Sequence, residues 1–139
     1  ATKLGLLLDQ GVRTFVDLTE PGELDPYGEQ LAAIASLRGL DVARLSHPIP
    51  DMGVVHDDAY DAIIEALHGA GDGVVYVHCW GGIGRTASVV GCWLVDQGHD
   101  ADEALERIDT LRSVTRKAHR PAPQNDEQID LIRRRWARR

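Results

Sequence analysis

The chain has 139 residues, of which 43% are hydrophobic and 27% are charged, and its formal net charge at pH 7 is −7. These values predict one soluble globular domain, and the negative charge argues against nonspecific binding to nucleic acid. The sequence has no apolar run of about 18 residues and no signal peptide, so we expect neither membrane insertion nor secretion. Two cysteines make no disulfide framework, which is typical of a cytoplasmic protein.

Strand and helix patterns alternate through the first half of the chain. Short β-rich runs predict strands over 12–18, 42–45 and 74–77. Apolar residues at helical spacing predict helices over 2–10, 30–38 and 57–69. In the second of these helices, Leu31, Ile34 and Leu37 are expected to share one buried face.

Helical patterns dominate the second half. An apolar run predicts a buried helix over 87–95, a capping box from Asp100 to Glu103 opens another, and a last helix over 124–138 follows Pro123. The alternation of strands and helices predicts an α/β fold with a parallel or mixed central sheet and helices on both faces. No internal repeat or linker divides the chain, so we expect a single domain over residues 1–139.

A glycine-rich loop, His78 to Thr86, lies between the strand over 74–77 and the helix over 87–95. Its three glycines let successive backbone N–H groups turn inward, and the start of a helix adds further unpaired N–H groups. The loop is therefore predicted to hold a tetrahedral oxyanion, which is the ordinary use of such a helix start in a parallel sheet.

Two side chains make this anion cradle a candidate reactive site. Cys79 lies at the loop's entrance, where the N–H groups, the helix start and Arg85 favour the thiolate, which is a nucleophile. The guanidinium of Arg85 can hold two phosphate oxygens at once. Thr86 places a hydroxyl where it could stabilise the sulfur as a leaving group.

The sequence His-Cys-x-x-Gly-x-Gly-Arg-Thr, after a strand and before a helix, resembles the signature loop of the cysteine-dependent protein tyrosine and dual-specificity phosphatases. The short chain is most similar to the compact dual-specificity type. The resemblance implies a three-layer domain with about four to five strands. Members usually have a strand or hairpin before the point where this chain begins, and the chain could lack that element.

The resemblance also implies an activity and its ligands. It implies hydrolysis of phosphotyrosine, and also phosphoserine or phosphothreonine, through a cysteinyl-phosphate intermediate. Substrates would be phosphorylated proteins or small phosphomonoesters, with phosphate, sulfate or vanadate able to occupy the loop. The residues inside the loop would contact the phosphate: Trp80, Gly81, Gly82, Ile83 and Gly84.

A general acid must protonate the leaving oxygen, and Asp51 is the candidate. It lies on a proline-stiffened loop after the strand over 42–45, as in the acid loop of the family. Asp57 and Asp58 compete for this role, although helix capping explains both of them.

Supporting roles are less defined. Gln124 and Gln128 resemble a Gln-x-x-x-Gln segment that places the hydrolytic water, or they form an ordinary polar first turn. His78 is expected to steady the loop by hydrogen bonding. No histidine and cysteine spacing suggests a metal ligand set, so no metal or other cofactor is expected.

Two features keep alternative interpretations open. In the segment 19–28, Glu20 or Tyr27 could contact substrate, or the segment is a solvated connector. Cys92 is interpreted as a core residue, and the alternative is a disulfide with Cys79 that acts as a protective switch.

Rival functions are a phosphatase for phosphoinositides or inositol phosphates, an inactive phospho-binding module, and a sulfur transferase. The uncharged residues between Cys79 and Arg85 favour a substrate with a single phosphate over the first of these.

Overall fold

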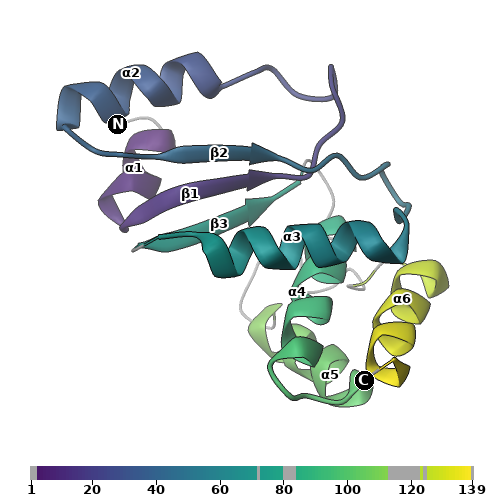
Figure 1. The fold of residues 1–139 in the computed structure, drawn as a ribbon. Coiled ribbons are helices and arrows are strands. Elements are labelled where there is room, and N and C mark those ends of the chain that lie inside the picture. The colour runs from purple at the N-terminus through teal and green to yellow at the C-terminus, as the bar shows by residue number, and fades with distance from the viewer. Residues whose placement is uncertain (1–2, 72, 80–83, 113–122, 124, 139) are drawn as a thin grey trace.

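The computed structural model describes residues 3–71, 73–79, 84–112, 123 and 125–138. Three strands and six helices lie along these residues: helices and strands alternate up to α4, and α5 and α6 follow it (Figure 1). They are α1 (Lys3–Asp9), β1 (Val12–Asp17), α2 (Gly28–Arg38), β2 (Ala43–Ser46), α3 (Asp57–Gly69), β3 (Val74–His78), α4 (Gly84–Asp96), α5 (Ala101–Arg112) and α6 (Asp126–Ala137).

The three strands form a parallel sheet in the order β2-β1-β3. The register aligns their carboxyl ends, because Asp17 at the end of β1 lies opposite both Ser46 of β2 and His78 of β3. The parallel arrangement is confirmed. The expected four to five strands are not found among the described residues, because only three runs have β-type patterning and the N-terminal segment forms the helix α1.

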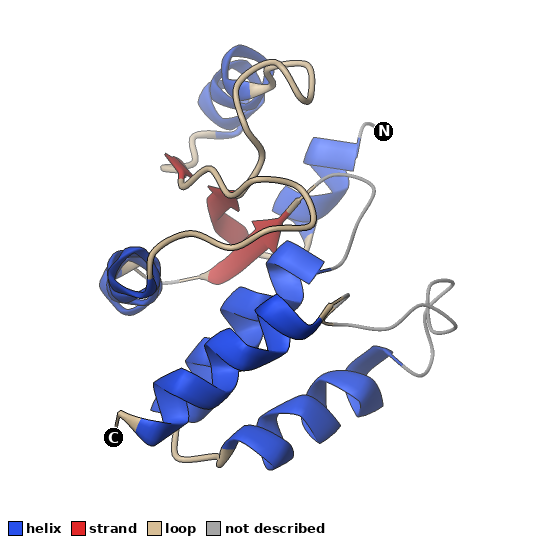
Figure 2. Ribbon diagram, turned by 90° about the vertical axis from the view of Figure 1, so that its right-hand side faces the viewer, coloured by secondary structure: helices blue, strands red, loops and turns tan. Residues whose placement is uncertain are grey.

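Helices cover both faces of the sheet, as predicted. Figures 1 and 2 show α1 and α2 on one side and the other four helices on the opposite side. A hydrophobic cluster lies on each face of the sheet, and adjacent residues of β1 pack into different clusters, since successive side chains of a strand point to opposite faces. Phe15 packs with Leu8 and Leu31, whereas Val16 joins the larger cluster formed with α3 to α6.

Local sequence signals explain several helix ends. The capping box is confirmed: the Glu103 N–H donates to Asp100 Oδ1 at 2.8 Å, and the Asp100 N–H donates to Glu103 Oε1 at 3.2 Å. Gly39 ends α2 in the left-handed conformation, with φ of 65°. The helix α4 begins at Gly84, three residues earlier than predicted, so its first turn includes Arg85.

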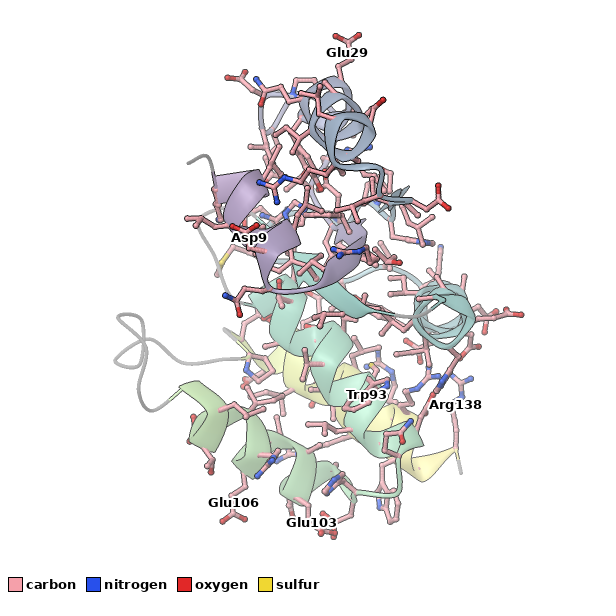
Figure 3. All side chains as sticks on the ribbon, turned by 90° about the vertical axis from the view of Figure 1, so that its left-hand side faces the viewer. Asp9, Glu29, Trp93, Glu103, Glu106 and Arg138 are labelled. Atoms are coloured by element: carbon pink, nitrogen blue, oxygen red, sulfur yellow. The ribbon has the colours of Figure 1, made fainter. Side chains whose placement is uncertain are left out.

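Side-chain exposure departs from the predicted pattern in two places. Leu37 is 89% exposed, because two successive three-residue steps from Leu31 rotate it about 120° away from the face that Leu31 buries. Trp93 of α4 reaches the surface (Figure 3) and is 37% exposed. Charged side chains such as Glu103 of α5 point outward (Figure 3).

The C-terminal helix α6 is fixed against α3 and α4 by ion pairs. Arg135 donates to both oxygens of Asp96 at 2.8 and 2.7 Å and to Asp61 at 2.8 Å. Arg134 donates to both oxygens of Asp57 at 3.1 and 2.9 Å. These contacts fix the last turn of α6 against the first turns of α3 and the end of α4. The described helices reach at most 13 residues, and none of them could cross a bilayer.

Candidate active site

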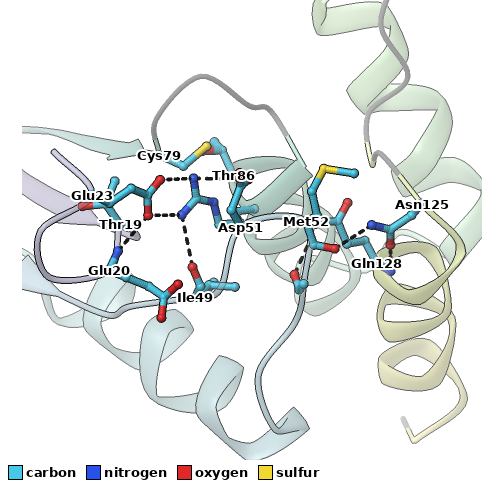
Figure 4. Close-up of polar contacts among 12 residues, drawn as sticks. Thr19, Glu20, Glu23, Ile49, Asp51, Met52, Cys79, Thr86, Asn125 and Gln128 are labelled. Atoms are coloured by element: carbon cyan, nitrogen blue, oxygen red, sulfur yellow. Dashed lines mark hydrogen bonds and ion pairs between the residues drawn. The ribbon is translucent and has the colours of Figure 1, made fainter.

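Segments that follow the three strands meet at the carboxyl edge of the sheet, where ligand sites of such sheets lie. Backbone hydrogen bonds join them beyond the strands: the Leu18 N–H donates to the His78 carbonyl at 2.9 Å, and the Ile49 N–H donates to the Leu18 carbonyl at 3.0 Å. Cys79 directly follows β3, and the first turn of α4 reaches the same place. The site is drawn in Figure 4.

The sulfur of Cys79 lies against Thr86. The Thr86 hydroxyl donates to Cys79 Sγ over 3.0 Å. Cys79 is half-buried and lines a pocket of about 340 Å³, whose walls also include Leu24 and Tyr27. By contrast, Cys92 is fully buried in the core, as predicted, and burial raises its pKa to about 12. The two thiols therefore have different surroundings, and Cys79 is the one at the strand end.

Arg85 is buried and pairs with a carboxylate. Its side chain is 1% exposed, and it donates to both oxygens of Glu23 at 2.8 and 2.6 Å and to the Ile49 carbonyl at 3.1 Å. The hydrogen bonds with Glu23 raise the pKa of Arg85, and negative charge at Cys79 and Asp51 adds to the effect. The two hydrogen bonds to Glu23 therefore hold the guanidinium in one orientation.

Asp51 lies at the same site. Its Oδ1 is 3.6 Å from Arg85 Nη2, and its side chain is 62% exposed. Of its competitors, Asp57 is bound to Arg134, whose hydrogen bonds hold the pKa of that carboxyl below its ordinary value, and Asp58 is exposed at the start of α3. The geometry places Asp51, and not these two, beside Arg85. Its role as general acid stays a prediction.

His78 is held by aromatic side chains. The Tyr27 hydroxyl lies 2.6 Å from His78 Nε2, and the ring of Tyr76 stacks on the imidazole with centroids 5.4 Å apart. Burial lowers the pKa of His78, partly opposed by Asp17, and burial raises the pKa of Tyr27 to about 12. Tyr27 and Tyr76 thus fix the position of the imidazole at the end of β3, and its role in steadying the loop stays a prediction.

The segment after β1 is more than a connector. The backbone N–H of Glu20 donates to Glu23 Oε1 at 3.0 Å, which helps to orient the partner of Arg85 (Figure 4). Glu20, Glu23 and Asp51 also line an open, polar hollow in the surface. Contact of Glu20 or Tyr27 with substrate stays a prediction.

The start of α6 contacts the loop that carries Asp51, at Met52 and Gly53. Asn125 is its N-cap, and the Asn125 side chain accepts from the Gln128 N–H at 3.0 Å and donates to the Met52 carbonyl at 2.7 Å. Gln128 is fully buried, and its side-chain amide donates to the Gly53 carbonyl at 3.4 Å. The predicted role of Gln128 in placing water stays a prediction.

Several predicted residues cannot be compared with the structure. Trp80, Gly81, Gly82, Ile83 and Gln124 lie outside the described residues. Gly84 is described: it is the first residue of α4, and its carbonyl accepts from the Ser88 hydroxyl at 2.7 Å.

Sequence reasoning missed two residues of the site, Glu23 and Asn125. A buried arginine needs a carboxylate partner, and Glu23 is one of the acidic residues that follow β1 at the carboxyl edge. Asn125 could have been recognised as an N-cap residue before Asp126 and Glu127.

Solved structures of several known proteins are similar to this chain. The structure of Tk-PTP in its active form is 24% identical with a TM-score of 0.72, and the match covers 99% of this chain and 86% of that one. Kinase associated phosphatase (KAP) is 21% identical with a TM-score of 0.69, covering 98% and 76%. TpbA of P. aeruginosa in complex with pTyr is 24% identical with a TM-score of 0.61, covering 96% and 78%.

These structures establish a shared fold. The family model described as "Swiss Army Knife protein, DSP-PTPase phosphatase domain" (PTP-SAK) matches residues 2–137. Since this match spans nearly the whole chain, the protein belongs to the PTP-SAK family of cysteine-based dual-specificity and tyrosine phosphatase domains.

Proposed function

We propose that this phosphatase domain hydrolyses phosphotyrosine monoesters in proteins through a cysteinyl-phosphate intermediate. One observation carries the proposal: two consecutive residues of α4 contact the proposed nucleophile and the proposed acid. Thr86 is hydrogen-bonded to the sulfur of Cys79, and Arg85 lies 3.6 Å from Asp51. The phosphotyrosine complex of TpbA, a structure with the same fold, supports this substrate class.

In the first step, the thiolate of Cys79 attacks phosphorus, so that a P–S bond forms and the ester P–O bond breaks. Asp51 as the carboxylic acid gives its proton to the leaving oxygen. Arg85 and the N–H groups of the loop hold the equatorial phosphoryl oxygens, where the charge of the transition state is spread.

In the second step, water attacks the phosphorus of the intermediate and gives a proton to the Asp51 carboxylate. The P–S bond breaks, inorganic phosphate leaves, and sulfur departs as the thiolate. The Thr86 hydroxyl, at 3.0 Å from the sulfur, stabilises the negative charge that returns to it.

The test is a panel of phosphopeptides, phosphoinositides and para-nitrophenyl phosphate, with vanadate as a competitive inhibitor. We expect turnover of phosphotyrosine peptides, abolished in Cys79→Ser, while that variant still binds phosphotyrosine peptide in calorimetry. Turnover of phosphoinositides without turnover of peptides would assign a non-protein substrate. Binding without any turnover by the unmodified protein would indicate an inactive phospho-binding module.

A further inference from the structure

The acid loop is a tight turn whose conformation is unfavourable on its own. The Gly53 N–H donates to the Pro50 carbonyl at 2.9 Å, which closes a turn with Asp51 and Met52 at its centre. Met52 has φ of 65°, a left-handed conformation that is unfavourable for a residue with a side chain. Such a turn persists when contacts from outside it favour that conformation.

Packing of its own side chains gives this turn little support. The side chain of Asp51 is 62% exposed, and Met52 is 49% exposed. Beside the 3.6 Å contact between Asp51 and Arg85, backbone contacts of the turn therefore help to fix the position of the carboxyl group.

Two consecutive carbonyls of the turn are held by α6. Asn125 donates to the Met52 carbonyl at 2.7 Å, and Gln128 donates to the Gly53 carbonyl at 3.4 Å, each across more than 70 residues of chain. Figure 4 shows both side chains reaching from α6 toward the turn. The shorter bond joins Asn125 to the carbonyl of the residue that directly follows Asp51.

The Asn125 amide has two separate tasks. Its oxygen caps α6 by accepting from the Gln128 N–H, and its nitrogen donates to Met52. Capping would explain the oxygen but not the nitrogen, because aspartate or serine caps a helix equally well and has no amide N–H to donate to a neighbouring loop. The helix that carries this cap is anchored, because Leu131 and Ile132 of α6 are buried in the core.

We propose that Asn125 is a positioning residue for catalysis: through the Met52 carbonyl it holds the turn that presents Asp51 to the leaving oxygen of the substrate. The proposal rests on the proposed role of Asp51 as general acid. It gives α6 a part in the reaction although Asn125 itself contacts no reacting atom.

The test separates the two tasks with Asn125→Asp. The carboxylate still caps α6, and its charge suits a helix start, but it has no N–H to donate to Met52. Asn125→Ser, a cap with a shorter side chain, provides a second variant should the first not fold. Arg134→Gln is the matched control, since it loosens the contact of α6 with α3 and leaves the turn untouched.

The readout is kcat/KM on two esters that differ in their need for an acid. Phenyl phosphate releases a phenol with a pKa of about 10, which needs a proton, whereas 2,4-dinitrophenyl phosphate releases a stable phenolate. We expect Asn125→Asp to lower kcat/KM on phenyl phosphate by about 10- to 100-fold, with a much smaller loss on the dinitrophenyl ester. In an Asp51→Asn background the substitution should add nothing, because the group it positions is gone.

Three results would overturn the proposal: equal losses on the two esters, a further loss in the Asp51→Asn background, or the same selective loss in Arg134→Gln. If Asp51→Asn itself shows no selective loss on phenyl phosphate, the general acid is another group and the proposed mechanism fails with it. A selective loss in Asp51→Asn but not in Asn125→Asp refutes only the positioning role.

Discussion

Replacing Glu23 by glutamine removes the charge that pairs with a buried arginine while it keeps the shape of the side chain. Arg85 is 1% exposed and gives two of its N–H groups to Glu23, at 2.8 and 2.6 Å. In Glu23→Gln one carbonyl oxygen can still accept, but the amide NH2 group would face an N–H of the guanidinium. We expect the variant to fold with a clear loss of stability.

The size of the loss follows from burial. Removing one partner of a buried ion pair costs about 3–5 kcal/mol, because the other charge is left without compensation. About a fifth of the Glu23 side chain is exposed, and Asp51 lies 3.6 Å from the guanidinium, so water and a second carboxylate offset part of this cost. The free energy of unfolding should fall by about 2–3 kcal/mol, which lowers Tm by about 6–12 °C.

Urea denaturation at several pH values provides the assay. Hydrogen bonds from Arg85 hold the pKa of Glu23 below its ordinary value of 4.5. The unfolded chain then binds more protons than the native protein between the two values, so the stabilisation is present above pH 4.5 and is lost as the pH falls through the native pKa. The difference between wild type and Glu23→Gln should therefore be largest at pH 7 and shrink below pH 4.5.

An exposed ion pair of the same length is the control. Arg38 and Asp9 lie 2.8 Å apart, with side chains 38% and 55% exposed. Asp9→Asn should change the free energy of unfolding by less than about 1 kcal/mol. A loss in Glu23→Gln no larger than that of Asp9→Asn, or one independent of pH, would refute this account of the buried pair.

Three further predictions concern other parts of the domain. A Cβ added at Gly91 would lie 2.3 Å from Ile132 Cδ1, so Gly91→Ala should destabilise by about 1–3 kcal/mol in urea, with partial recovery when Ile132→Val is added. Burial lowers the pKa of His78 below 6.5, so the unfolded chain binds more protons between the two values; the free energy of unfolding should fall as pH is lowered through 6.5, and His78→Gln should flatten this dependence. Because burial raises the pKa of Cys92 to about 12, a thiol reagent at pH 8 should modify Cys79 in the folded protein and Cys92 only after denaturation; early loss of both thiols would contradict this.

Local signals in the sequence predicted local structure well. The capping box from Asp100 to Glu103 is present with both reciprocal hydrogen bonds, because its two residues are close along the chain. The same holds for the contact between Cys79 and Thr86, which a single strand–loop–helix unit brings together.

Contacts between distant segments could not be predicted in the same way. Glu23 reaches Arg85 across 62 residues, and Asn125 reaches the Met52 carbonyl across 73. Each pairing depends on which of many polar side chains the packed elements bring to the carboxyl edge, and spacing in the sequence carries no information on that. The number of strands was overestimated for a related reason: it was taken from the resemblance, whereas the described residues contain three runs that can pair.

The close approach of α4 and α6 at Gly91 has a consequence for how variants of this protein are interpreted. Each helix brings a residue of the candidate site to the same edge with its first turn or cap, Arg85 for α4 and Asn125 for α6, so the crossing sets the spacing between Arg85 and the loop that carries Asp51. A bulkier residue there would shift that spacing with no reacting atom nearby. In a directed-evolution library, such substitutions would score as catalytic defects, and their origin in interhelical geometry would be visible only from the structure.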